Sequence, residues 1–218
     1  MNRRMKGIGL AAALLLPGVA NATLLDRGHG LIYDDVLDIT WLQNANLGAG
    51  SSFDDGFNTS DGRMTWQSAV DWADGLSFQG FDDWRLATFN SASPTTSAFD
   101  CSSGTAAACA ASGNELGYMY YHNMGSSGVT TGTPTVDGVA LNNVQSAYWS
   151  GTEFNSTNAW DFDFVNGGQF HDVKSINLAA WAVRPGDVLA APEPTTLLLL
   201  GLGLAGLGFG RRRKRPRP

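Results

Sequence analysis

Acidic residues and histidines are the side chains that could transfer protons or bind metal ions. The chain of 218 residues contains 20 acidic residues and three histidines. His29, His122 and His171 are scattered along the sequence and lack the short spacing of metal ligands. The hydrolase motifs Gly-x-Ser-x-Gly and His-Glu-x-x-His do not occur in it. Carboxylate pairs are frequent simply because the chain is acidic, so they do not indicate a glycosidase. We therefore expect a protein that is not an enzyme.

One stretch is rich enough in oxygen atoms to suggest a metal ion. Residues 54–62 contain Asp54, Asp55 and Asp61, and calcium takes about six to eight oxygen ligands from such loops. The stretch lacks the Asp-x-Asp-x-Asp-Gly order and the closing Glu of an EF-hand. Calcium binding therefore stays open, with a solvated loop held by Asx turns as the alternative.

The first 22 residues have the parts of a secretory signal peptide. Basic residues precede a short apolar run at 8–16, and Ala20 and Ala22 form an A-x-A cleavage site. We expect signal peptidase to cleave here, so that the mature chain begins at Thr23. The alternative is an uncleaved anchor, which the short apolar run does not favour because it cannot span a bilayer.

The C-terminal segment also indicates sorting. Pro192, Glu193 and Pro194 precede an apolar run, and a basic cluster at 211–215 follows it. A helix over about 195–210 would reach roughly 24 Å, somewhat short of a hydrocarbon core of about 30 Å, and its basic end would stay cytoplasmic. This order resembles a PEP-CTERM sorting signal. The resemblance implies removal of the tail by exosortase at the inner membrane of a Gram-negative bacterium; a plain membrane anchor is the alternative.

Two cysteines, Cys101 and Cys109, are the only ones in the chain. An even number in an exported protein predicts a disulfide, which would stabilise the fold by about 2.5 kcal/mol. Zinc is not expected, because a second pair of ligands is missing. A reactive thiol would need a base such as His122, and nothing in the sequence places the two together.

The charges of the chain are unevenly distributed. Nine of its 14 basic residues lie among the first six and last eight residues, so 23–191 holds five basic and 19 acidic residues, a net charge of −14. Such a body does not suit nucleic acid. It also repels anionic polymers and attracts cations.

The pattern of the body predicts an α+β fold with much loop. Thr65 is placed to cap a helix whose apolar residues recur with helical spacing through Leu76. A second helix is expected at 115–121, and short strands at 30–42, 148–150, 159–165, 169–174 and 179–184. Residues 44–63, 90–113 and 125–138 are predicted to be loops.

The ordered motifs at 65–69, 80–88, 148–154 and 181–185 resemble the Lcl C-terminal domain family. The positions that carry this resemblance are Trp66, Trp84, Arg85, Leu86, Trp149, Ser150, Glu153, Trp160, Lys174 and Arg184. Ala87, where Pro is usual, and the segment with the cysteines depart from the family pattern. The resemblance implies a C-type-lectin-like fold, with two helices and a small twisted antiparallel sheet. It also implies a domain at about 23–187, followed by the linker and sorting signal at 188–218.

Most tryptophans are expected in the core, with one or two left to stack on sugar. Arg85 and Arg184 are expected to pair with carboxylates, for which Asp82, Asp83 and Glu153 are the candidates; binding of a ligand carboxylate is the alternative. In sugar-binding C-type lectins a Trp-Asn-Asp motif ligates calcium, and residues 160–163 here match it only loosely.

These observations lead to one interpretation and two alternatives. We expect a non-catalytic protein that is exported as an inner-membrane-anchored precursor and then sorted to the cell surface or extracellular matrix, where it serves adhesion or associates with exopolysaccharide. Its expected partners are signal peptidase, exosortase and extracellular polysaccharide, with no cofactor beyond the open question of calcium. The alternatives are a structural matrix protein without a specific ligand, and an enzyme that acts on surface polymers.

Overall fold

The computed structural model describes residues 23–55, 57–58, 61–89, 101–102, 104–125 and 131–188. The predicted signal peptide with Ala20 and Ala22, the Pro192-Glu193-Pro194 motif and the predicted apolar helix at 195–210 lie outside the described residues. Among the helices that are described, none has the length and apolar character needed to cross a membrane.

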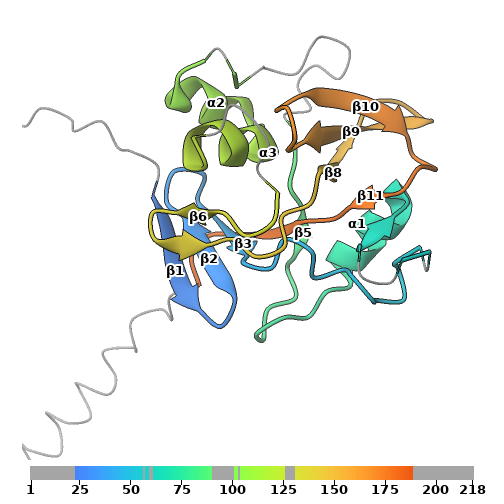
Figure 1. Ribbon diagram of the computed structural model, residues 1–218, viewed down its shortest axis with the longest axis horizontal. Helices are drawn as coiled ribbons and strands as arrows, with labels where there is room; N and C mark the ends of the chain where they lie inside the picture. Colours follow the sequence, from blue (N-terminus) through green and yellow to red (C-terminus); the bar gives the residue numbers. More distant parts are fainter. Residues whose placement is uncertain are drawn as a thin grey trace, which may run out of the picture.

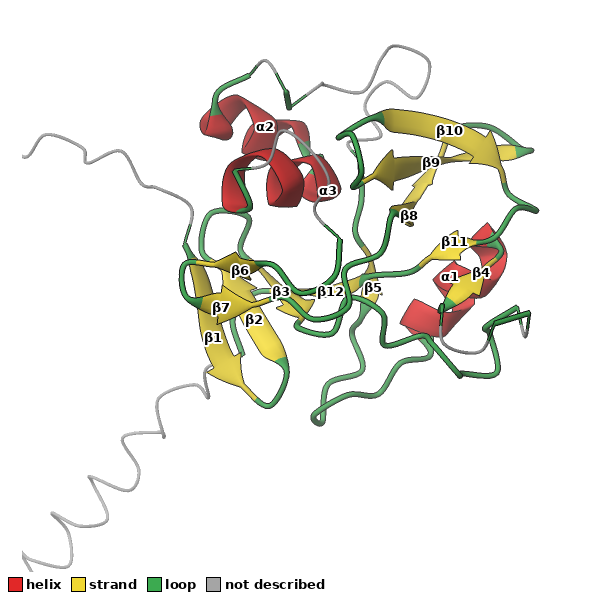
Figure 2. Ribbon diagram, viewed as in Figure 1, coloured by secondary structure: helices red, strands yellow, loops and turns green. Residues whose placement is uncertain are grey.

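Two five-stranded sheets form the framework of the domain (Figures 1 and 2). The first has the order β1-β2-β3-β12-β5, and the second has the order β10-β9-β8-β11-β4. The strands of the first sheet are β1 Leu24–Gly28, β2 Leu31–Asp34, β3 Ile39–Leu42, β12 Ala182–Pro185 and β5 Arg85–Leu86. The strands of the second are β10 Gln169–Val173, β9 Asn158–Asp163, β8 Ala147–Glu153, β11 Leu178–Ala179 and β4 Arg63–Met64.

The fold is α+β, as predicted, but it contains more sheet than the single small antiparallel sheet that was expected. β11 pairs with β8 in parallel, through Ala179 and Tyr148, so the second sheet is mixed. The predicted strand at 179–184 is in fact two strands, β11 and β12, which belong to different sheets. The buried Trp181 lies between them, at the point where the chain crosses from one sheet to the other.

Helix α1, Trp66–Asp74, begins where the sequence predicts, but it ends two residues before Leu76, the last residue of the predicted apolar spacing. The Thr65 side chain accepts a hydrogen bond from the Ser68 amide, which satisfies one of the free donors of the first turn. Gly75 follows the last helical residue, and Ala69, Trp72 and Ala73 form the buried face. The cap and the apolar spacing thus act together to fix this helix.

Two of the predicted loops contain regular structure. Helix α2, Ala106–Ser112, lies in the segment 90–113, because five of its seven residues are alanine, the best helix former, and Thr105 caps it. Gly113 ends it in the left-handed conformation, at φ 73°. The other correction is a hairpin that begins within 125–138 and ends just after it, formed by β6 Thr135–Val136 and β7 Val139–Ala140. Its turn residues Asp137 and Gly138 both have positive φ.

The second predicted helix is two short elements, α3 Glu115–Tyr118 and the π-helical turn η1 Met119–Asn123. This helix packs its apolar side chains against the aromatic core, where Tyr120 contacts Phe162 and Phe164. With α1 and α2, the described residues therefore contain three α-helices rather than the two that were expected.

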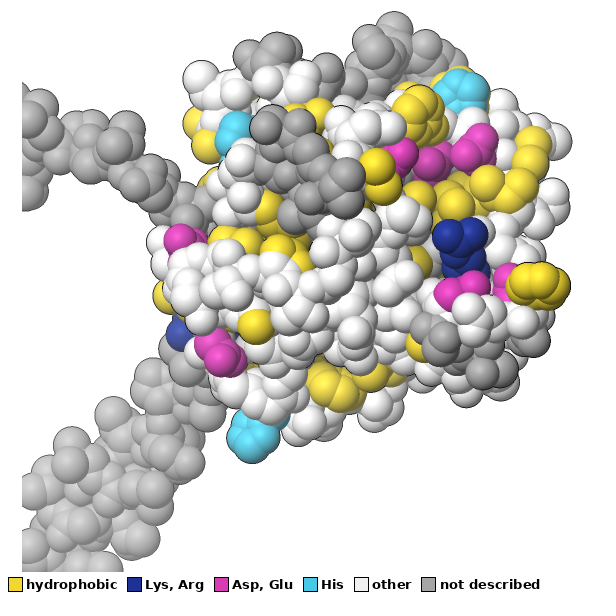
Figure 3. Space-filling model, in the orientation of Figure 1, with side chains coloured by type: hydrophobic (Ala, Val, Ile, Leu, Met, Phe, Trp, Pro, Cys, Tyr) yellow, Lys and Arg dark blue, Asp and Glu magenta, His cyan; other side chains and the backbone are white. Residues whose placement is uncertain are grey.

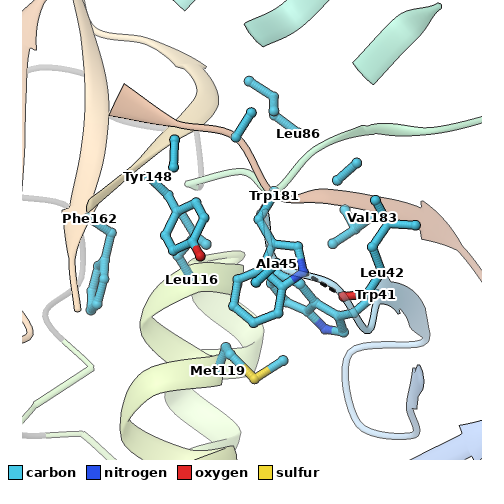
Figure 4. Packing of buried hydrophobic residues seen from close by; sticks show 14 of the residues in the cluster. Trp41, Leu42, Ala45, Leu86, Leu116, Met119, Tyr148, Phe162, Trp181 and Val183 are labelled. Atoms are coloured by element: carbon cyan, nitrogen blue, oxygen red, sulfur yellow. Dashed lines mark hydrogen bonds between the residues drawn. The ribbon is translucent and has the colours of Figure 1, made fainter. Parts of the chain in front are cut away.

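Tryptophans hold the centre of the core (Figure 4). The rings of Trp41 and Trp181 meet edge to face, with centroids 4.9 Å apart, and the Trp181 indole donates to the Leu42 carbonyl at 2.7 Å. Six of the seven tryptophans are buried, and Trp66 is half-buried. Core packing therefore accounts for most of them, and it leaves little tryptophan surface for stacking on sugar.

Candidate functional site

Arg85 is held by a bidentate ion pair with Glu115, whose Oε1 and Oε2 lie 2.7 and 2.8 Å from its guanidinium nitrogens. Glu115 is 7% exposed and also accepts from the Thr88 amide at 2.7 Å. This hydrogen-bonded partner raises the pKa of Arg85. The expected partners were Asp82, Asp83 and Glu153, so the prediction was wrong for this arginine. Glu115 was missed because it lies 30 residues away, in the first turn of α3.

Arg184 has one of the expected partners. Its guanidinium makes two hydrogen bonds to Asp83, at 2.7 and 2.9 Å, and lies over the ring of Phe81 at 4.1 Å from the ring centre. The Arg184 hydrogen bonds lower the pKa of Asp83. Asp82, the neighbouring candidate, is exposed. Both arginines of the motifs thus have a protein carboxylate as partner, and ligand carboxylate binding is not needed to explain them.

Four motif residues from distant parts of the chain meet beside β8. Lys174 pairs with Glu153 and lies 4.5 Å from the ring centre of Trp66. The Trp66 indole in turn donates to the Ser150 carbonyl at 2.8 Å. Trp149 donates to the Met64 carbonyl, which joins β8 to β4. These residues connect α1, β8 and the end of β10, so their role is to fix how the second sheet packs.

A groove of about 620 Å³ opens next to this junction. One wall is Thr88 and Phe89 after β5, and the others are the end of α2 with Gly113 and the part of β8 from Gly151 to Glu153. Thr152 fixes the floor, because its hydroxyl donates to the Phe89 carbonyl and accepts from the Phe89 amide. The remaining lining residues are Ala110 and Ala111, whose short side chains occupy little of the groove.

The charged groups at the groove are paired within the protein. Glu153 is bound to Lys174, and Glu115, which holds the amide of Thr88, is bound to Arg85. Glu115 is largely buried in its pair, whereas the Glu153 side chain is 54% exposed. The lining of the groove therefore combines the Thr88 side chain, glycine backbone and the paired Glu153 carboxylate.

The acidic loop brings three carboxylates together. Oxygens of Asp54, Asp55 and Asp61 lie within 4.8 Å of one another, and Asn177 donates to Asp55 at 3.0 Å. Backbone amides of the loop satisfy several of these oxygens; those of Gly50 and Gly62, for example, donate to Asp54. Three carboxylates supply only part of the coordination shell of calcium. Both the calcium expectation and the Asx-turn alternative fit this geometry.

The predicted lectin-like stretch lies on β9, where Asp161 is 3% exposed. Trp160 and Phe162 point into the core, so Asp161 and Asp163 lie on the other face of the strand. Burial, together with the nearby charge of Asp172, raises the pKa of Asp161 to about 7. Asp163 holds the hairpin turn instead, through the Val165 amide and the Asn166 side chain.

A second buried carboxylate, which the sequence analysis missed, lies in the first sheet. Asp34 is fully buried, and its oxygens accept from the amides of Val36 and Leu37 and from the Asn123 side chain at 2.7 Å. Burial is the main cause that raises the pKa of this carboxyl. Asp34 therefore ties β2 to η1, and it has a structural role away from the groove.

The two cysteines form the expected disulfide, which links the segment before α2 to the helix itself. The bond takes up both thiols of the chain, so neither is available as a nucleophile. The three histidines lie on separate elements: His29 in the β1–β2 turn, His122 in η1 and His171 on β10. In the described part of the chain, none of these histidines belongs to a group of three or more side chains that could hold a metal ion.

These features define an α+β protein whose motif arginines and lysine pair with its own carboxylates. The family model of the Lcl C-terminal domain matches residues 30–184, so the chain belongs to this family. A second model, the PEP-CTERM protein-sorting motif, matches residues 190–214. The chain is therefore an exported bacterial protein with a recognition signal for exosortase processing. A search of curated proteins finds no match.

Proposed function

We propose that the protein is a non-catalytic component of the cell surface or extracellular matrix that associates with polysaccharide through the groove beside β8. The observation that carries this proposal is the groove's polar lining, made of the Thr88 side chain, glycine backbone and the paired Glu153 carboxylate. Such groups match the hydroxyls of a neutral sugar, and they provide no free acid and base for hydrolysis.

The family and the sorting motif support the same function. A sorted protein reaches the outside of the inner membrane, and the proposed host is a Gram-negative bacterium that secretes an exopolysaccharide. The proposed fold is C-type-lectin-like: β1 near the start and β12 near the end of the domain belong to one sheet, and long connections carry the groove. This likeness rests on family analogy, which gives a fold but not a ligand.

A pair of matched variants tests the groove. Every described helix and strand lies between residues 24 and 185, so the chain 23–191 is suited to binding assays on a glycan array, with and without EDTA. Ala111→Trp should block the groove from the exposed side of α2, whereas Ala107→Trp, on the same helix but outside the lining, should leave it open. Loss of binding only in the first variant supports the groove. Binding by neither the wild type nor Ala107→Trp to any matrix polysaccharide would favour a structural protein without ligand.

The sorting part of the proposal has its own test. The intact mass of the mature protein from its host should correspond to a chain that begins at Thr23 and lacks the basic cluster at 211–215. A mature protein that retains this cluster would contradict exosortase processing and would favour a plain anchor.

A further inference from the structure

The β9–β10 hairpin presents a solvent-side face with an unusual composition. Phe170 and Asp161 are partners in the antiparallel ladder, so their side chains share a face. Asp172 and Asp163 lie two residues further along their strands, on the same face. We call these four residues the hairpin face. Figure 3 shows acidic side chains in a row in this region of the molecule, with hydrophobic side chains beside them.

The hairpin face has an aromatic ring available to a ligand. Phe170 is 48% exposed, which is high for a large apolar side chain on a strand. β10 is the edge strand of its sheet, and no other described strand pairs with its outer side. A ring in this position costs free energy in water unless something covers it.

The acidic groups of the hairpin face lack a cation. The four ion pairs found among the described residues do not include Asp161, Asp163 or Asp172. Asp161 is almost wholly buried, yet its Oδ1 has no hydrogen-bond partner. An unsatisfied buried carboxylate oxygen is costly and calls for a donor. The neighbouring position on β8 is Trp149, whose indole donates elsewhere, to Met64.

We propose that the hairpin face binds the ammonium groups of an amino-sugar polymer. One sugar ring lies against Phe170, and its ammonium group donates to the exposed carboxylate of Asp172, beside the buried carboxyl of Asp161. Charge-assisted hydrogen bonds to ammonium are the strong kind, and an ammonium group near an aromatic ring gains further attraction.

A compact divalent-metal site does not fit the same residues. The one group of three acidic side chains in the described part of the chain whose oxygens approach within 4.8 Å is Asp54, Asp55 and Asp61. The carboxylates of the hairpin face are spread along two strands, which suits a polymer that carries several separate charges better than it suits one ion. The inference rests on the proposed function in that the ligand is a matrix polysaccharide, but it uses a different surface from the groove.

Calorimetry with the chain 23–191 tests the proposal. The probes are glucosamine hexamer, N-acetylglucosamine hexamer, which has the same sugar frame without charge, and lysine hexamer. We expect the glucosamine hexamer to bind and the acetylated hexamer to bind at least tenfold more weakly. Asp172→Asn and Phe170→Ala should each weaken glucosamine binding about tenfold. Asp82→Asn, which removes the same charge from an exposed turn elsewhere, should change it less than twofold.

Three results would overturn the proposal. Equal binding of the two sugar hexamers would remove the role of the ammonium group. Unchanged binding by Asp172→Asn would place the site elsewhere. Lysine hexamer that binds as tightly as glucosamine hexamer, and competes with it, would indicate a basic peptide as partner. Ala111→Trp separates this proposal from the groove, because it should abolish groove binding and leave glucosamine binding intact.

Discussion

Replacement of Asp161 by asparagine should stabilise the protein at neutral and alkaline pH. The folded-state pKa of about 7 lies roughly three units above the ordinary value of 3.8, because burial penalises the charged form. The folded state therefore holds the proton more tightly than the unfolded chain. The stability that this proton confers is complete below pH 4, decreases as the pH rises, and is lost above pH 7.

The expected size follows from this shift. Each unit corresponds to about 1.4 kcal/mol, so three units give an upper value of about 4 kcal/mol. Asp161 lies next to the edge strand, where small movements let water reach the carboxylate and reduce the cost of its charge. We therefore expect a stabilisation of about 2 kcal/mol, half the upper value. Asp161→Asn keeps the shape and stays neutral, and it should therefore gain about this amount at pH 8 and almost nothing at pH 4.

Urea unfolding at pH 4, 6 and 8 measures the effect directly, with Asp172→Asn as the control. Asp172 is exposed, so its replacement should relieve only the repulsion that it exerts on Asp161 and should stabilise by less than half as much. The reasoning would be refuted if Asp161→Asn were less stable than the wild type at pH 8. Equal gains for Asp161→Asn at pH 4 and pH 8 would also refute it, since the effect must follow ionisation.

Three further predictions concern the framework. Arg85→Met should leave Glu115 buried and unpaired and should lower the free energy of unfolding by roughly 2–4 kcal/mol in urea titrations; a change below 1 kcal/mol would mean that the pair contributes little. Reduction of the bond between Cys101 and Cys109 should cost about 2–3 kcal/mol, measured as the shift in the urea midpoint between oxidised and reduced protein. An unchanged midpoint would show that the segment keeps its structure without the bond. Thr65→Ala should cost about 1 kcal/mol, and Thr65→Ser should restore most of it; equal losses for both would argue against capping.

Local signals were sufficient for some parts of the fold. Thr65 and the apolar residues that follow it predict α1 because a cap and a helical period lie within ten residues. The alternation at 159–165 predicts β9 for a similar reason. Helix α2 was missed because its alanines lack an apolar period and stand among the small residues typical of loops, although their intrinsic helix propensity is high.

Contacts between residues far apart in the sequence could not be predicted, and they determine the site. The sequence identified Arg85 as needing a carboxylate, but it could not select Glu115, which is brought near by the packing of α3 against the end of β5. The periodicity likewise placed Asp161 on the polar face of a half-buried strand. Only the pairing of β9 with both β8 and β10 places Trp149 and Phe170 on either side of Asp161, where this carboxylate is buried.

The central claim is that the exported domain associates with matrix polysaccharide through the groove beside β8. The most direct test is the distribution of the protein between the neutral fraction of its host's extracellular polysaccharide, which offers no ammonium group to the hairpin face, and the surrounding medium. We predict that the wild type and Ala107→Trp stay with the polysaccharide, and that Ala111→Trp appears in the medium. The claim would be contradicted if Ala111→Trp remained with the polysaccharide to the same extent as the wild type.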